Sequence, residues 1–150
     1  MKHEMICVIE NKNFSLRDAQ QTLYYSSWDP KEVADFHETI GNKKTPLVKL
    51  PGLAKRLGIG SLLLKDESHR FGLNAFKALG VSYAMYRQIE KNPQIKTFCT
   101  ATDGNHGRAV AWMARKLGRK ALIYMPKGTV SDRVRAIEQE GADVFVIDQA

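Results

Sequence analysis

Residues 97–126 read TFCTATDGNHGRAVAWMARKLGRKALIYMP, and this stretch decides the fold. It begins and ends with short apolar runs typical of buried strands, at 97–101 and 121–125. Between them, residues 106–117 carry apolar side chains at helical spacing, and Gly118 follows as a typical helix stop. A strand, a helix and a strand of these lengths predict two parallel strands joined by a right-handed crossover.

The same alternation extends to both sides of this unit. SLLLK at 61–65 looks like a buried strand, and residues 75–90 have a helical apolar period. Ser131 is predicted to cap a helix that ends at Gly141, and VFVI at 144–147 is a further strand. We therefore expect an α/β fold with an open, mainly parallel twisted sheet and helices on both faces.

The first 41 residues are interpreted as an N-terminal arm. Within it, Asp29 is a suitable helix cap with Pro30 at the first helical position, and an apolar stripe follows. After Pro46 the strand and helix alternation begins. The expected division is an arm at 1–41 and, at 42–150, one part of a larger α/β domain.

Composition excludes several classes of protein. With 43% hydrophobic and 26% charged residues, the chain is expected to fold as a globular protein. No apolar run approaches the roughly 20 residues of a membrane span, and residues 1–13 lack the apolar core of a signal peptide. We therefore expect a cytoplasmic protein without a membrane partner.

Charge and cysteine content exclude two further classes of site. The net charge is +7, but the basic residues are scattered and no nucleic-acid-binding signature accompanies them, so we expect no nucleic-acid partner. Cys7 and Cys99 are too far apart for a disulfide framework and have no neighbours at metal-ligand spacing. Cys99 lies in an apolar run and is expected to be a buried free thiol, and no metal site is predicted.

Ligands of open α/β sheets bind at the carboxyl ends of strands, which directs attention to the segments after Lys65 and after residue 101. The first, residues 65–80, reads KDESHRFGLNAFKALG and places Lys77 in the first turn of a helix. Cations are disfavoured there, and desolvation by Phe76 would further favour a neutral amine, the form that Schiff-base chemistry requires. The alternative is an exposed lysine. Asp66 and Glu67 are interpreted as structural or rim residues.

The second segment is a polar turn between a strand and a helix, at residues 103–107. Its backbone N–H groups and the helix N-terminus favour an anionic ligand. Two simpler interpretations remain open on the residues alone. Asp103 is also a suitable N-cap for the helix, and His106 is also explained as a solvated side chain.

Taken together, TPL at 45–47, the lysine segment and the glycine/asparagine turn resemble the fold-type II family of pyridoxal-phosphate (PLP) enzymes. The resemblance implies that Lys77, after Phe76, binds PLP through a Schiff base and that Asn105 holds the cofactor's phenolic oxygen. It also implies that Thr102, Asp103 and Gly104 approach the substrate. The loop that binds the PLP phosphate is expected beyond residue 150, and a homodimer is expected.

Two positions depart from the common pattern of this family, since Ala75 and Asp103 stand where many members have serine. Both departures resemble its diaminopropionate ammonia-lyase branch. That likeness implies α,β-elimination of the amino acid 2,3-diaminopropionate to pyruvate and ammonia, with Lys77 as the base for the L form and Asp103 for the D form. There are two alternatives. One is another member of the family, such as a threonine or serine dehydratase, and the other is a non-catalytic α/β fragment.

Overall fold

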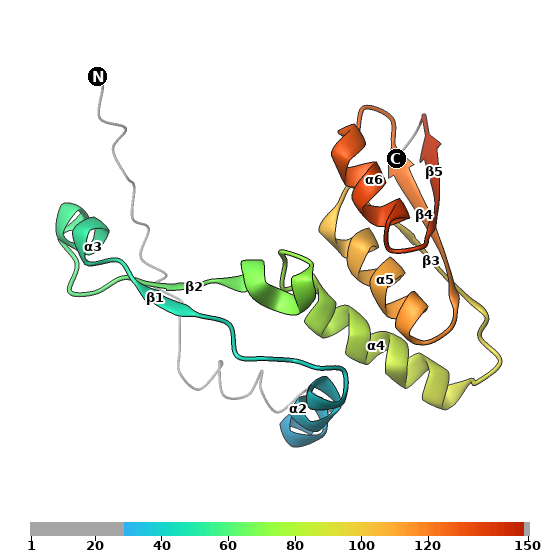
Figure 1. Cartoon of the computed structure of the whole chain (residues 1–150), viewed down its shortest axis with the longest axis horizontal. Helices are drawn as coiled ribbons and strands as arrows, with labels where there is room; N and C mark the ends of the chain where they lie inside the picture. The colour runs from blue at the N-terminus through green and yellow to red at the C-terminus, as the bar shows by residue number, and fades with distance from the viewer. Residues whose placement is uncertain (1–28, 149–150) are drawn as a thin grey trace, which may run out of the picture.

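The computed structural model describes residues 29–148, which contain a three-stranded parallel sheet. Strands β3 (Thr97–Ala101), β4 (Lys120–Pro126) and β5 (Asp143–Ile147) lie in the order β3-β4-β5. Helices α5 (Asn105–Lys116) and α6 (Ser131–Glu138) provide the two crossovers (Figure 1). The predicted α/β class and the parallel pairing are therefore confirmed.

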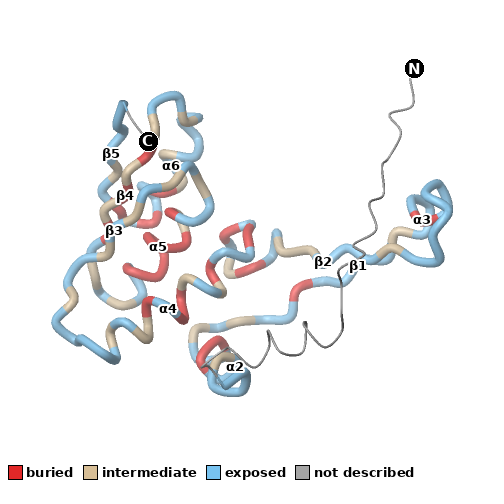
Figure 2. The backbone as a smooth tube through the Cα atoms, turned by 180° about the vertical axis from the view of Figure 1, so that it is seen from behind, coloured by how far each residue is buried: buried red, intermediate tan, exposed pale blue. Residues whose placement is uncertain are grey.

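Helix α5 occupies the middle of the hydrophobic core (Figure 2). Its inner face, including Val110 and Met113, is buried with Ile123 and Met125 of β4. On its other side α5 packs against α4 (Lys77–Lys91). The apolar period recognised in the sequence is thus buried on two sides, which fixes α5 between the sheet and α4.

In the described part of the chain, α5 and α6 cover the same face of the sheet (Figure 1). On the opposite face Tyr124 and Phe145 stack with ring centroids 5.3 Å apart, and Phe145 stays 45% exposed. Cys99 is exposed, which corrects the expectation of a buried thiol. The reason is strand alternation: Phe98 points toward the helices, so Cys99 points away from them.

The stretch at 61–65 is a strand, but the prediction that it is buried is wrong. Strand β2 (Leu63–Lys65) pairs antiparallel with β1 (Leu47–Lys49), and all six residues of this two-stranded ribbon are exposed. The ribbon and helix α3 (Pro51–Leu57) extend away from the parallel sheet (Figure 1). An apolar run indicates a strand without indicating its partner, and here the partner is a neighbouring hairpin strand.

Helix α2 (Pro30–Thr39) begins as predicted, because Asp29 accepts a hydrogen bond from the Lys31 backbone N–H at 2.9 Å. Phe36 of this helix stacks on Tyr86 of α4 at 4.6 Å between ring centroids. Helix α6 begins differently from the prediction, since its N-cap is Val130 and Ser131 is its first residue. Residues 1–28 of the predicted arm, with Cys7, lie outside the described residues.

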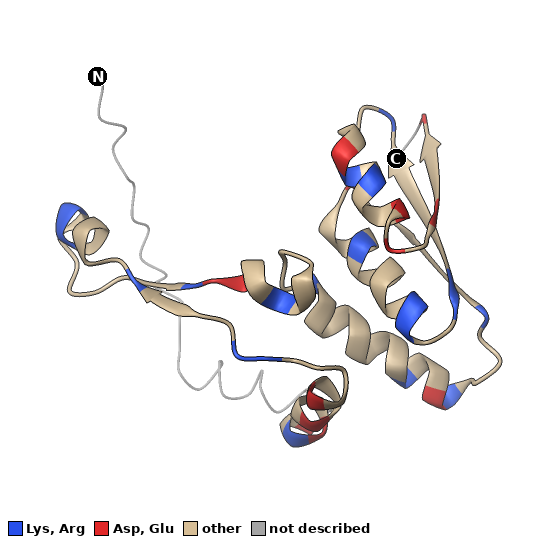
Figure 3. Cartoon of the chain, viewed as in Figure 1, with Lys and Arg blue, Asp and Glu red and all other residues tan. Residues whose placement is uncertain are grey.

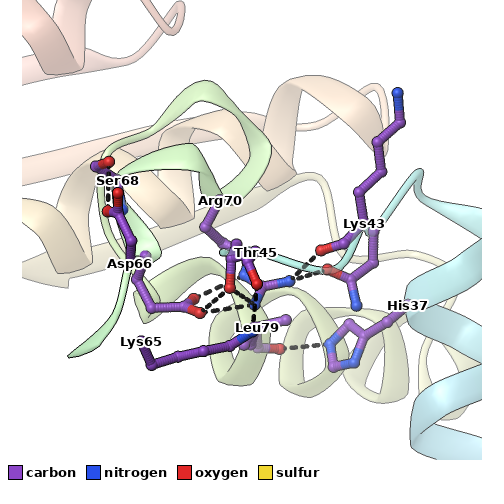
Figure 4. Close-up of polar contacts among 10 residues, drawn as sticks. His37, Lys43, Thr45, Lys65, Asp66, Ser68, Arg70 and Leu79 are labelled. Atoms are coloured by element: carbon purple, nitrogen blue, oxygen red, sulfur yellow. Dashed lines mark hydrogen bonds and ion pairs between the residues drawn. The ribbon is translucent and has the colours of Figure 1, made fainter. Parts of the chain in front are cut away.

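A buried arginine anchors the base of the ribbon (Figure 4). Arg70, in the short helix η1 (Glu67–Gly72), is 7% exposed and donates to both carboxylate oxygens of Glu67 at 2.7 and 2.8 Å. Glu67 also accepts from the Thr45 hydroxyl at 2.6 Å, and Arg70 donates to the Lys43 carbonyl at 2.9 Å. Glu67 is therefore a structural residue, in agreement with the sequence, and Asp66 caps η1 through the Ser68 N–H.

Replacing Glu67 with glutamine is expected to lower the free energy of unfolding at pH 7 by about 2 kcal/mol, because charge-assisted hydrogen bonds to a buried guanidinium are lost. Hydrogen bonds from Arg70 and Thr45 lower the pKa of Glu67 from 4.5 to about 2. This contribution is complete above pH 4.5 and is lost as the pH falls toward 2. Urea unfolding across this range should show a smaller loss of stability in Glu67→Gln than in wild type. Curves of unfolding free energy against pH that run parallel for the two proteins would contradict this prediction. Glu38→Gln, at an exposed position, is the control.

Candidate active site

Most of the residues expected at the site line one polar pocket of about 410 Å³. Three elements contribute to it: the first turn of α4, the turn between β3 and α5, and the first turn of α6. The lining residues are Lys77, Thr102, Asp103, Gly104, Asn105, His106 and Arg133. The structure thus brings the two segments singled out in the sequence to one place, even though β2 does not belong to the parallel sheet.

Lys77 is the first residue of α4, as predicted. The loop before it turns back through left-handed backbone conformations at Gly72 (φ 73°) and Asn74 (φ 57°), both favoured residue types for that region. The amine of Lys77 lies 5.5 Å from the centroid of the Phe76 ring, within cation–π range. Phe76 is 58% exposed and Lys77 is also exposed, so the expected desolvation is not observed among the described residues. Phe76 is not part of the pocket lining.

The turn after β3 is held by hydrogen bonds that its backbone N–H groups donate. The Thr102 N–H donates to the Tyr124 carbonyl at 2.9 Å, and the Gly104 N–H donates to the Thr102 hydroxyl at 3.1 Å. Gly104 is the N-cap of α5, which excludes the simpler interpretation of Asp103 as the cap. Asn105 is the first residue of α5 and therefore enters the pocket from a fixed helix end.

Asp103 faces a cation that the sequence analysis did not single out. Arg133 of α6 donates from Nη1 to the Asp103 carbonyl oxygen at 3.2 Å, and the same nitrogen lies 3.7 Å from the carboxylate Oδ2. The Asp103 side chain is 78% exposed. The only sequence signal for Arg133 was its place in the first turn of a helix that follows a strand end.

Close backbone packing sets the position of this turn. A Cβ atom added at Gly107 of α5 would lie 2.3 Å from Cγ2 of Thr102 and 2.9 Å from Cγ2 of Ile123. Real side chains do not approach that closely, so only glycine allows α5 to lie directly on the turn and on β4. The contact between Gly107 and Thr102 fixes the helix end that carries Asn105.

Gly107→Ala is expected to lower the free energy of unfolding by about 1–3 kcal/mol through overpacking. This outweighs the roughly 1 kcal/mol by which alanine is favoured over glycine inside a helix. Gly80→Ala in α4 is the matched control, since nothing lies within 4 Å of its added Cβ, and it should be neutral or stabilising. The midpoints of urea unfolding measure both. A Gly107→Ala protein as stable as Gly80→Ala would contradict the packing.

The pocket fits PLP in the groups it presents. It has the primary amine of Lys77 for the aldehyde, the amide of Asn105 for the phenolic oxygen, and the N-terminus of α5 for negative charge. In the described residues there is no cluster of three His, Cys, Asp or Glu side chains that would hold a metal ion. None of the helices in residues 29–148 is long and apolar enough to cross a membrane.

Comparison with known proteins agrees with this geometry. The sequence is 43% identical to diaminopropionate ammonia-lyase of Escherichia coli K12 over 161 aligned residues, which cover 95% of this chain and 40% of that protein. A biosynthetic L-threonine dehydratase of Haemophilus influenzae is more distant, at 37% identity over 68% of this chain and 19% of that protein. The chain therefore spans about 40% of the length of the diaminopropionate ammonia-lyase that it matches.

A solved structure shows the same relation. The Escherichia coli diaminopropionate ammonia-lyase in complex with an aminoacrylate-PLP azomethine reaction intermediate superposes with a TM-score of 0.74 at 48% identity, covering 79% of this chain and 34% of that one. The family model described as pyridoxal-phosphate dependent enzyme matches residues 38–150, three quarters of the sequence. The chain belongs to the family of pyridoxal-phosphate-dependent enzymes.

Proposed function

We propose that the protein catalyses the PLP-dependent α,β-elimination of 2,3-diaminopropionate to pyruvate and ammonia. The observation that carries this proposal is that Lys77 lines one pocket together with Asp103 and Asn105 of a separate segment. The 43% identity to an Escherichia coli diaminopropionate ammonia-lyase supports the choice of substrate. When bound, PLP supplies the electron sink that makes the Cα–H bond of an amino acid acidic.

We further propose that residues 42–150 supply the N-terminal part of a PLP-dependent lyase domain and that residues 1–41 form an arm. The rest of the fold, including the loop that binds the PLP phosphate, is assigned to sequence outside these 150 residues. The match to 40% of the length of the relative supports the assignment of these residues to part of a longer fold. Residues 30–39 of the arm are the helix α2, which packs against α4.

The proposal assigns tasks to the residues expected at the site. Lys77 would hold the cofactor through its amine, and the same amine, once free, would take the Cα proton of the L isomer. Asn105 orients the cofactor ring, and Phe76 contacts the Lys77 amine from outside the pocket lining. Thr102 and Gly104 bind the substrate carboxylate through hydroxyl and backbone groups.

Asp103 takes the Cα proton of the D isomer, because a base is needed on each face of the substrate if both enantiomers react. Its negative charge also suits the β-ammonium group that leaves as ammonia. Asp103 is free to act in this way because the N-cap of α5 is Gly104 and its carboxylate is 78% exposed in the pocket.

A threonine or serine dehydratase is the alternative activity, supported by the 37% identity to a threonine dehydratase. Such an enzyme expels a β-hydroxyl group, for which the charge of Asp103 offers no electrostatic advantage. The described residues also fit a non-catalytic α/β fragment that kept the pocket, which would bind no cofactor. The closer relation to the ammonia-lyase favours the first proposal.

The stoichiometry of the products separates these activities. The protein at its full natural length, loaded with PLP, should form two ammonia molecules for each pyruvate from 2,3-diaminopropionate. Serine yields one ammonia for each pyruvate, and threonine yields 2-oxobutyrate in place of pyruvate. Faster turnover of serine or threonine than of 2,3-diaminopropionate would refute the proposed substrate, and no turnover of any of them would favour the fragment.

We also propose a cytoplasmic homodimer without membrane or nucleic-acid partners. Exposed apolar side chains on the ribbon and on the open face of the sheet supply surface for association, among them Leu63, Leu64 and Phe145. The basic positions are spread over α3, α5 and α6 (Figure 3), which does not favour one nucleic-acid-binding face.

A further inference from the structure

Arg133 lines the pocket, and the proposed reaction gives it no task. It enters from α6, whose position against α5 is fixed by a buried carboxylate: Glu140 is 7% exposed and pairs with Arg108 at 3.1 Å and Arg115 at 2.7 Å. Ile137 of α6 is fully buried in the same region. The backbone that carries Arg133 is therefore held firmly against the helix that follows the Asp103 turn.

Two interactions join Arg133 to that turn. Its Nη1 donates to the Asp103 carbonyl oxygen at 3.2 Å, and the same nitrogen lies 3.7 Å from the Asp103 carboxylate, which is longer than a hydrogen bond. The aliphatic Cδ of Arg133 also lies close to Gly104, since a Cβ added there would be 3.7 Å from it. The guanidinium thus holds the backbone of the turn while the carboxylate keeps its oxygens available.

We infer that Arg133 is a positioning residue that fixes Asp103 at the pocket and so controls use of the substrate enantiomer that depends on Asp103. The hydrogen bond to the backbone restricts the turn, and the guanidinium places a positive charge beside the Asp103 carboxylate. The consequence for the D isomer rests on the proposed function. The positioning of the turn is independent of the proposed function and can be measured without enzyme turnover.

The test of positioning uses nuclear magnetic resonance on the protein at its full natural length. Arg133→Gln should lower the backbone ¹⁵N order parameters of Asp103 and Gly104, which are expected near the rigid value of about 0.85 in the wild type. Arg135→Gln is the matched control, because Arg135 lies on the same helix, is exposed, and pairs with Asp132 away from the pocket. Unchanged order parameters in Arg133→Gln would overturn the inference.

The test of enantiomer control uses the PLP-loaded protein at its full natural length. Arg133→Gln should reduce kcat for D-2,3-diaminopropionate roughly tenfold, with little change in KM, and should leave the L isomer within about twofold. Arg133→Lys, which restores the charge, should recover part of the loss. In an Asp103→Asn background, Arg133→Gln should have no further effect on the D isomer if it acts through Asp103.

Equal losses for both enantiomers, or additive losses in the double variant, would overturn the inference while leaving the proposed function intact. A wild-type protein that turns over neither enantiomer would instead refute the proposed function. In that case the order parameters alone decide whether Arg133 positions the turn, so the two failures are distinguishable.

Discussion

Lys77→Ala is expected to abolish the elimination of ammonia from both enantiomers of 2,3-diaminopropionate, lowering kcat/KM by roughly 10³-fold or more. The reason is that one amine serves twice in the proposed reaction, first as the covalent attachment of the cofactor and then as the base for the L isomer. The measurement is the rate of pyruvate formation by the PLP-loaded protein at its full natural length.

Lys91→Ala is a matched control for this variant. Lys91 is the last residue of the same helix, is exposed, and lies outside the pocket, so its removal should leave kcat/KM within about twofold of wild type. Near-normal activity of Lys77→Ala, with its folding confirmed by urea unfolding, would mean that Lys77 is not the essential amine.

Asp103→Asn should discriminate between the enantiomers. Activity on D-2,3-diaminopropionate is expected to fall by roughly 10²- to 10⁴-fold, the range typical for loss of a general base, because an amide cannot accept the Cα proton. Activity on the L isomer, whose proton goes to Lys77, should change by less than about tenfold through the lost charge beside the β-ammonium group. Rates with each pure enantiomer, measured as pyruvate formed, provide the comparison.

Asp143→Asn is the matched control, because it removes a carboxylate at the start of β5, away from the pocket. It should leave the rate of pyruvate formation from each enantiomer unchanged. If Asp103→Asn retained full activity on the D isomer, another group would have to be its base. Equal losses on the two isomers would instead assign Asp103 a role in substrate binding.

Much of the fold was predictable because its signals are local. The apolar period of α5, the stop at Gly118 (φ 64°) and the bounds of β3 all follow from side chains that meet within one element. Gly107 was recognised only as a member of the turn. Its close contact with Thr102 depends on how α5 crosses the sheet, which no local pattern encodes.

The wrong burial predictions and the missed arginine share one physical cause. The sequence shows which side chains are apolar or charged, but not which other segment each of them will contact. Leu63 and Leu64 look buried by type yet lie on an exposed ribbon, and Cys99 occupies the face of β3 that no described helix covers. Arg133 was missed because a cation in the first turn of α6 reaches Asp103 only after both crossovers have formed. A contact between segments so far apart in the sequence is not encoded in any local pattern of residues.

The central claim, that Lys77 is the amine that binds PLP, has a direct chemical test. The protein at its full natural length is mixed with PLP, its visible absorption spectrum is recorded beside that of Lys77→Ala, and sodium borohydride then fixes any lysine–PLP linkage for peptide mapping. We expect an absorption band that Lys77→Ala lacks and a label concentrated on Lys77. A band that persists in Lys77→Ala, or a label spread over exposed lysines such as Lys91 and Lys127 without preference for Lys77, would contradict it.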